Sequence, residues 1–128
     1  MSGMLRTDHR VTLGKSGENY ACLELERRGY AILERRYRTR VGEIDVIARD
    51  GETLVFVEVK ARRSARFGYP AEAVTAQKQR RLMQMASFYI LRKGLSNSRC
   101  RFDVVAVTFG TGEPRPRVEV FKGAFDAV

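Results

Sequence analysis

The sequence predicts a single α/β domain, over residues 13–128, in which helices flank a mixed β-sheet. Between residues 42 and 60, two β-branched, apolar runs are joined by Asp50-Gly51, a dipeptide typical of hairpins. Two segments, about 13–28 and 73–93, have the apolar spacing of helices. The near-continuous apolar run 102–109 is typical of a strand buried on both faces. The expected order is therefore helix, three strands, helix, two strands.

The first helix is expected to follow a flexible, polar N-terminal arm at residues 1–12. Its apolar stripe runs through Ala21, Cys22 and Leu25, and Glu18 interrupts that stripe. The carboxylate has two interpretations. It can be a structural anion that the N-terminus of the helix favours, or it can be an additional acidic group directed at the hairpin, and the spacing favours neither.

The remaining elements follow from the same patterns. Residues 30–37 are expected to form the first strand, and residues 117–121 a last strand at the edge of the sheet. In the second helix, Lys78 interrupts an apolar stripe. Its ammonium could reach water from a buried stem, or it could meet phosphate at the mouth of a site. Asp103, at the head of the buried strand, is expected to pair with an arginine as a structural anchor.

Four charged residues interrupt the apolar pattern of the hairpin, namely Glu43, Asp45, Glu58 and Lys60. Side chains alternate between the faces of a strand, so Glu43 shares a face with Asp45, and Glu58 shares one with Lys60. A two-residue loop, at Asp50-Gly51 or Gly51-Glu52, would also place opposed residues on one face. Asp45 would then lie opposite or diagonal to Glu58, whereas a three-residue loop would separate the two.

Grouped charges on a half-buried strand pair cost several kcal/mol each, by order of magnitude, unless something compensates them. Lys60 can neutralise one carboxylate, and a cluster of carboxylate oxygens suits a hard cation such as Mg²⁺ or Mn²⁺. The alternative is a surface hairpin whose polar face is simply hydrated. The matched strand faces of Asp45, Glu58 and Lys60 favour a site.

The net charge of +9 makes polyanions the leading class of partner. Basic residues cluster around the hairpin and at the start of the second helix, where each cluster alone could be a solvated face. Together they favour contacts with a phosphate backbone. The arginines predicted to bind nucleic acid are Arg38, Arg40, Arg62, Arg63, Arg66, Arg80 and Arg81.

Other function classes are disfavoured. No apolar run approaches the ~20 residues of a membrane-spanning helix, so no membrane partner is expected. Cys22 and Cys100 lack metal-ligand spacing and are interpreted as free thiols, which indicates the reducing cytoplasm. The only histidine, His9, is remote from the motifs, so a Ser-His or Cys-His nucleophile is not expected.

The helix and strand order, with Ile44-Asp45 on the second strand and Glu58-Val59-Lys60 on the third, resembles the PD-(D/E)xK nuclease superfamily, whose fold is restriction-endonuclease-like. Ile44 stands where that motif has its proline. More narrowly, the chain resembles the YraN family, small bacterial proteins similar to archaeal Holliday-junction resolvases. This resemblance covers roughly residues 14–126, through Gly17-Glu18, Gly42-Glu43-Ile44-Asp45, Phe56-Val57-Glu58-Val59-Lys60, Phe67-Gly68, Lys78 and Arg101-Phe102-Asp103.

The resemblance implies roles for particular residues. Asp45 and Glu58 would ligate Mg²⁺ together with the Val59 carbonyl, and Glu18 would complete the metal site. Lys60 would orient or activate the attacking water, and Lys78 would support the site from the second helix.

The expected function is therefore a metal-dependent endonuclease that hydrolyses DNA phosphodiester bonds, with branched or damaged DNA as candidate substrates. The alternative is a nucleic-acid-binding module that retains the nuclease fold without cutting. A third reading is a basic protein-interaction domain with a decayed site, which the intact acidic set disfavours. The resemblance also implies a homodimer, because similar resolvases act as dimers on two scissile strands.

Overall fold

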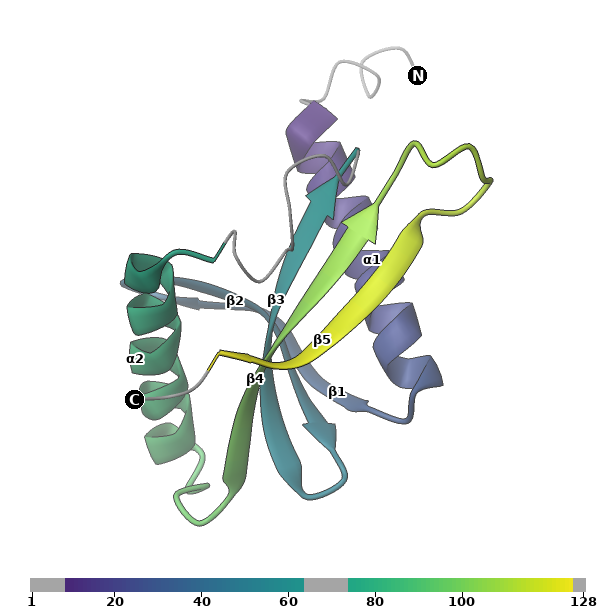
Figure 1. Cartoon of the computed structure of the whole chain (residues 1–128). Helices are drawn as coiled ribbons and strands as arrows, with labels where there is room; N and C mark the ends of the chain where they lie inside the picture. The colour runs from purple at the N-terminus through teal and green to yellow at the C-terminus, as the bar shows by residue number, and fades with distance from the viewer. Residues whose placement is uncertain (1–8, 64–73, 126–128) are drawn as a thin grey trace, which may run out of the picture.

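The computed structural model describes residues 9–63 and 74–125, with the side chains described from residue 15 onward (Figure 1). One five-stranded sheet, in the order β1-β2-β3-β4-β5, lies between two helices. The order of elements along the chain is the predicted one. The elements are α1 (His9–Arg27), β1 (Ala31–Thr39), β2 (Gly42–Asp50), β3 (Thr53–Arg62), α2 (Ala76–Arg92), β4 (Arg99–Thr108) and β5 (Arg117–Phe125).

The sheet is mixed, as predicted. The β3 and β4 strands are parallel, whereas the β1–β2, β2–β3 and β4–β5 pairs are antiparallel. The strand β4 is buried from Phe102 to Thr108, and β5 lies at the sheet edge, in agreement with the sequence. None of the helices in the described ranges is long and apolar enough to cross a membrane.

The helix α1 begins at His9, four residues before the predicted start at Leu13. The predicted arm, residues 1–12, therefore overlaps the helix at residues 9–12, and its first eight residues lie outside the described part of the chain. The prediction and the structure differ in the backbone of residues 9–12, which is helical. Polar residues without an apolar stripe can still extend a helix, because each added residue gains a backbone hydrogen bond once the helix is nucleated.

The β2–β3 hairpin has a two-residue loop at Gly51-Glu52. The register pairs Val46 with Val57 and Asp50 with Thr53, so the loop between the paired strands contains two residues. Gly51 has φ 61°, which a residue without a Cβ adopts at little cost. The premise on which the shared face of Asp45 and Glu58 depended is therefore confirmed.

Each helix covers its own face of the sheet. On one face, Leu82, Met85 and Tyr89 of α2 pack in a cluster that includes Ile47 and Phe56 of the hairpin. On the other face, residues of α1 pack on β2, β3 and β4, and this cluster contains Ala21, Cys22, Leu25, Val46, Val55, Val57 and Val105. The stripe predicted for α1 is therefore the one that packs on the sheet.

Gly17 sets the distance between α1 and the sheet. A Cβ atom at this position would lie 2.7 Å from the Cβ of Ala61 on β3, closer than two such atoms can approach. The absent side chain therefore lets the helix backbone lie directly on β3. The next residue along the helix is Glu18, so this close approach also brings a carboxylate to the sheet.

Candidate functional site

The site begins where β2 stops pairing with β3. The antiparallel register ends at Val46 and Val57. At the residue of β2 just before Val46, Asp45 Oδ2 accepts a hydrogen bond of 2.8 Å from the backbone N–H of Val59. A side-chain oxygen thus takes the place of a strand carbonyl, and β2 turns away from β3 toward α2 (Figure 1). The bond fixes the Asp45 carboxylate in the opening between the two strands.

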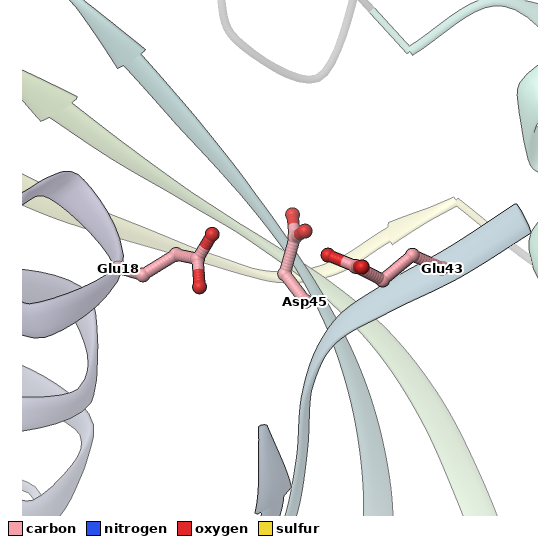
Figure 2. Close-up of side chains that lie close together, drawn as sticks. All are labelled: Glu18, Glu43 and Asp45. Carbon is pink, nitrogen blue, oxygen red and sulfur yellow. The ribbon is translucent and has the colours of Figure 1, made fainter. Parts of the chain in front are cut away.

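Two further carboxylates approach Asp45. One oxygen atom from each of Glu18, Glu43 and Asp45 lies within 4.8 Å of the other two, and Figure 2 shows the three side chains pointing toward one another. Glu18 comes from α1, whereas Glu43 and Asp45 come from β2. We call Glu18, Glu43 and Asp45 the acidic cluster. Separation at this distance suits oxygens that share one cation.

Glu58 on β3 is a fourth carboxylate at this place, and it is only 5% exposed. Its Oε1 accepts a hydrogen bond of 2.8 Å from Lys78 Nζ. Its Oε2 is buried without a hydrogen-bond partner in the described part of the structure. A buried charged oxygen without a partner costs more than about 1–3 kcal/mol, so this atom needs a ligand or a proton.

Electrostatics supports the same conclusion at Asp45. Burial raises the pKa of the Asp45 carboxyl from 3.8 to about 7, and the negative charges of Glu58 and Glu18 raise it too, against the hydrogen bond from the Val59 amide. The folded chain therefore holds more negative charge here than its own groups stabilise.

Two lysines lie beside these carboxylates. Burial lowers the pKa of Lys60, and the nearby Lys78 ammonium lowers it further, whereas the charges of Glu58 and Asp45 act in the opposite direction. For Lys78, burial also lowers the pKa, but the hydrogen bond to Glu58 and the charges of Glu58 and Asp45 outweigh burial, so its pKa is raised. Lys78, which interrupts the apolar stripe of α2, therefore pairs with Glu58 of β3.

Arginines hold two members of the acidic cluster. Arg36 Nε lies 2.7 Å from Glu18 Oε1, and Arg38 Nε lies 3.0 Å from Glu43 Oε2. Arg36 has φ 54°, a left-handed conformation that costs a residue with a Cβ about 1–2 kcal/mol. Each of these bonds uses one oxygen of a carboxylate, so the arginines orient the acidic side chains without enclosing them.

A shallow cleft of about 180 Å³ lies at the edge of this site. Its lining includes Glu43 of the acidic cluster, Lys78, Arg81 and Met85. Arg80 and Arg81 are both exposed on α2, and of the two Arg81 is the one that lines this cleft.

The model of the Uncharacterised protein family UPF0102 matches residues 17–107. This chain belongs to that family. The resemblance to the YraN family that the motifs predicted is thereby confirmed. The UPF0102 match begins at Gly17 and contains every residue of the acidic cluster, together with Glu58, Lys60 and Lys78.

Individual UPF0102 proteins match most of the chain. The UPF0102 protein of Syntrophus aciditrophicus is 48% identical over 96% of this chain and 95% of its own length. That of Anaeromyxobacter dehalogenans is 51% identical over 93% of this chain and 87% of its own. That of Geobacter sulfurreducens is 47% identical, over 92% and 91%.

In this UPF0102 chain, the structure brings together all five residues predicted to be catalytic, which are Glu18, Asp45, Glu58, Lys60 and Lys78. The predicted ligand set contained Glu58, whereas the acidic cluster contains Glu43 instead. Glu58 lies beside the cluster and forms an ion pair with Lys78. The sequence signal for Glu43 was its position on the same strand face as Asp45. The Val59 carbonyl as a ligand stays a prediction.

The predicted nucleic-acid arginines are more widely spread. Arg38 pairs with Glu43 from near the end of β1, and Arg40 lies in the β1–β2 turn. Arg62 Nε donates to Thr108 Oγ1 at 3.2 Å, and Arg63 is exposed just beyond the end of β3. Arg66 lies outside the described residues. Arg36, which is not among the predicted arginines, is the cation that pairs with Glu18.

A second buried carboxylate, Asp103 on β4, is fully enclosed. Its Oδ1 accepts from Arg101 Nε at 2.8 Å and from the Gly123 amide at 3.0 Å. Its Oδ2 accepts from the Tyr30 hydroxyl at 2.9 Å and from Arg101 Nη2 at 3.0 Å. Asp103 is therefore the arginine-paired anchor that the sequence predicted.

Proposed function

We propose that this UPF0102 protein is a nuclease that hydrolyses DNA phosphodiester bonds with the help of Mg²⁺ or Mn²⁺. The observation that most supports the proposal is Glu58 Oε2, a buried carboxylate oxygen without a partner in the described structure, beside an acidic cluster that is itself crowded. Burial of an unpaired charged oxygen is costly, so Oε2 takes either a cation or a proton shared with Asp45, whose pKa is raised by burial and by the neighbouring Glu58.

The donor set fits a hard divalent cation. Glu18, Glu43 and Asp45 each offer an oxygen within 4.8 Å of the others, and Glu58 offers its unpaired Oε2. Carboxylate oxygens are the ligands that Mg²⁺ and Mn²⁺ prefer, and the described site offers no histidine or thiol that would favour a softer metal. The chemistry that such a cation supplies is charge neutralisation at a phosphoryl oxygen and a lower pKa for an attacking water.

The two lysines of the site, Lys78 and Lys60, would have different roles. Lys78 donates a hydrogen bond of 2.8 Å to the Glu58 carboxylate and so holds it in place. Lys60 is half-buried beside it, with a lowered pKa, and its ammonium can donate to the negative charge that develops on the phosphate oxygens. Removal of one such preorganised donor costs about 10²–10³-fold in rate in other hydrolases.

Charge on the outer surface favours a nucleic-acid substrate. The net charge is +9, Arg81 lines the cleft at the site, and Arg38 pairs with Glu43 of the acidic cluster. Phosphate contacts of this kind make binding fall steeply with salt, with a slope of about −0.9 per contact on duplex DNA.

The decisive experiment is a cleavage assay on four-way junction, flap, single-stranded and duplex DNA, with Mg²⁺, Mn²⁺ or EDTA. We expect metal-dependent cutting that is lost in Lys60→Ala and kept in Lys93→Ala. The control replaces a lysine on the surface beyond α2, whose side chain is 53% exposed. Cutting that persists in EDTA, or in Lys60→Ala, would contradict the proposed mechanism.

Metal binding can be measured separately from cutting. We expect Mg²⁺ to raise the melting temperature of the wild-type protein and to have a much smaller effect on Glu58→Gln, which removes the charge of the unpaired oxygen. If Mg²⁺ raises the melting temperature and salt-sensitive DNA binding is present, yet no substrate is cut, the protein is the non-cleaving nucleic-acid-binding module instead.

A further inference from the structure

A hollow of about 540 Å³ lies between the β1–β2 turn and the second half of α2, beside the acidic cluster. It is distinct from the cleft at the acidic site, and neither the acidic cluster nor the lysines line it. The residues that carry the argument are Tyr37, Arg38, Arg40, Val41, Phe88 and Arg92. The hollow therefore combines three arginines with two aromatic rings.

Two of the three arginines of this hollow are available to a ligand. Arg38 has its ion pair with Glu43 at the inner end. For Arg40 and Arg92, the described ranges 9–63 and 74–125 contain no acidic group in an ion pair with either guanidinium. Two guanidinium groups without an acidic partner among the described residues raise the local concentration of anions and disfavour a basic partner.

Phe88 gives the hollow an aromatic wall. Phe88 directly precedes the buried Tyr89 in α2, but its own side chain is 50% exposed. The buried stripe is filled by Leu82, Met85, Ala86 and Tyr89, which leaves Phe88 beyond the contact with the sheet. An exposed ring next to arginines is the combination on which nucleobases stack while phosphates are neutralised.

The hollow and the acidic site are adjacent. Val41 lines both the hollow and the cleft that contains Glu43 and Lys78. The turn that carries it is fixed by the Thr39 hydroxyl, which donates to the Gly42 carbonyl at 3.0 Å and accepts from the Val41 amide at 3.2 Å. A strand that follows this surface can therefore place one nucleotide in the hollow and a neighbouring phosphate near the acidic cluster.

We propose that the hollow binds an unpaired nucleotide of a nucleic-acid strand, with its base against Phe88 and its phosphates at Arg40 and Arg92. The role of this nucleotide in positioning a phosphate for cleavage rests on the proposed function, whereas the binding itself does not. A base inside a duplex cannot enter a hollow of this kind, so the preferred substrate has unpaired nucleotides beside the cut.

The charge argues against a second copy of the chain as the occupant. A two-fold contact would place this surface against itself, and therefore arginine against arginine, in a protein of net charge +9. A nucleic-acid strand has the complementary charge and the planar groups that stack on an aromatic ring.

The test compares two single strands of equal charge in EDTA, where no metal-dependent cutting interferes. One is a fluorescein-labelled oligothymidine of about 15 nucleotides, and the other is the same sugar-phosphate strand without bases. Fluorescence anisotropy gives both dissociation constants. We expect the wild-type protein to bind the strand with bases about tenfold more tightly, and we expect this preference to fall several-fold in Phe88→Leu.

Two matched controls accompany this comparison. Leu91→Ala removes an apolar side chain that is 70% exposed on the same helix but does not line the hollow, so the base preference should stay at its wild-type value. For charge, Arg92→Ala should weaken both strands and lower the salt slope by about 0.7. Arg117→Ala, on the opposite edge strand, should leave that slope unchanged.

The outcomes separate the two proposals. If Phe88→Leu keeps the full base preference, the nucleotide site is wrong, whether or not the protein cuts DNA. If the preference depends on Phe88 while no substrate is cut with any metal, the site stands and the nuclease proposal fails. If Phe88→Leu changes the oligomeric state and leaves the base preference intact, the hollow is an interface between copies and the proposal is overturned.

Discussion

Asp103 and Glu58 are buried carboxylates on adjacent strands, and the protein treats them differently. Asp103 is 0% exposed, and both of its oxygens accept hydrogen bonds, from an arginine, a tyrosine hydroxyl and a backbone amide. Glu58 is 5% exposed, and one of its oxygens accepts from Lys78 while the other has no partner within the described residues. Both are on the central strands, so burial alone does not explain the difference.

This difference distinguishes a buried carboxylate that stabilises the fold from one that binds a ligand. A carboxylate that only stabilises the fold is surrounded by donors, as Asp103 is, because each missing partner lowers stability. A carboxylate that must receive something from solution keeps an oxygen free, as Glu58 does. The acidic cluster next to Glu58 shows the same incompleteness, since its three carboxylates face one another.

The largest expected effect concerns the enclosed carboxylate. Asp103→Ala should lower the free energy of unfolding by about 3–5 kcal/mol, because it leaves the Arg101 guanidinium and the Tyr30 hydroxyl without their acceptor. Urea denaturation measures this change, and added Mg²⁺ should not restore the loss. A loss below about 1 kcal/mol would show that Asp103 is not the structural anchor.

A smaller effect of opposite sign is expected in the acidic cluster. Asp45 has a pKa of 3.8 before burial and about 7 in the folded protein, so folding favours its neutral form and stability falls as pH rises through this window. Asp45→Asn removes the charge and keeps an oxygen for the Val59 amide. In metal-free buffer it should therefore be more stable than the wild type at pH 8, with almost no difference at pH 4.

Urea denaturation at both pH values measures the Asp45 effect. The matched control is Asp50→Asn, because the Arg101 hydrogen bond lowers the pKa of that carboxyl. Asp50→Asn should therefore lose stability at pH 8, in contrast to Asp45→Asn. A loss of stability in Asp45→Asn at pH 8 would mean that the crowded carboxylates are not a source of strain.

Gly17→Ala tests the support of the cluster. The new Cβ would lie 2.7 Å from that of Ala61, and such overpacking costs about 1–3 kcal/mol, offset by about 1 kcal/mol of better helix propensity. We expect a net loss near 1 kcal/mol and weaker Mg²⁺ binding, because Glu18 moves with the helix. Ala61→Gly in the same chain should recover the Mg²⁺ affinity, and a failure to do so would exclude this clash as the cause.

The smallest effect is expected at the start of α2. Thr75 Oγ1 accepts from the Lys78 amide at 3.2 Å and caps the helix that presents Lys78 to Glu58. Thr75→Ala should cost about 0.5–1 kcal/mol in thermal or chemical unfolding, whereas Thr75→Ser keeps the cap and should cost less. Equal losses in both variants would mean that the hydroxyl does not support the helix.

Local patterns were sufficient to predict the parts of this site that lie on one element or one hairpin. Strand alternation and the two-residue loop placed Asp45 near Glu58, and helix spacing identified Glu18 and Lys78 as charges on buried stripes. Those predictions follow from periods of two and 3.6 residues, which the sequence displays directly.

The remaining features depend on how elements meet. Glu43 joins the acidic cluster where β2 turns away from β3, and that divergence is a property of the assembled sheet. Arg36 pairs with Glu18 from a left-handed backbone conformation, which the sequence does not predict for an arginine. Phe88 is exposed because it lies outside the contact between α2 and the sheet. Sequence spacing does not give the width of that contact.

The hydrogen bond from the Val59 amide to Asp45 has a spectroscopic consequence. Most amides of β3 lie in sheet pairing, whereas this one donates to a side chain that can change its charge or its ligand. In a ¹H–¹⁵N correlation spectrum, the Val59 signal should therefore shift with protonation of Asp45 and with each cation that reaches it. One amide resonance would thus follow the occupancy of the site in solution, without a substrate and without an added label on the protein surface.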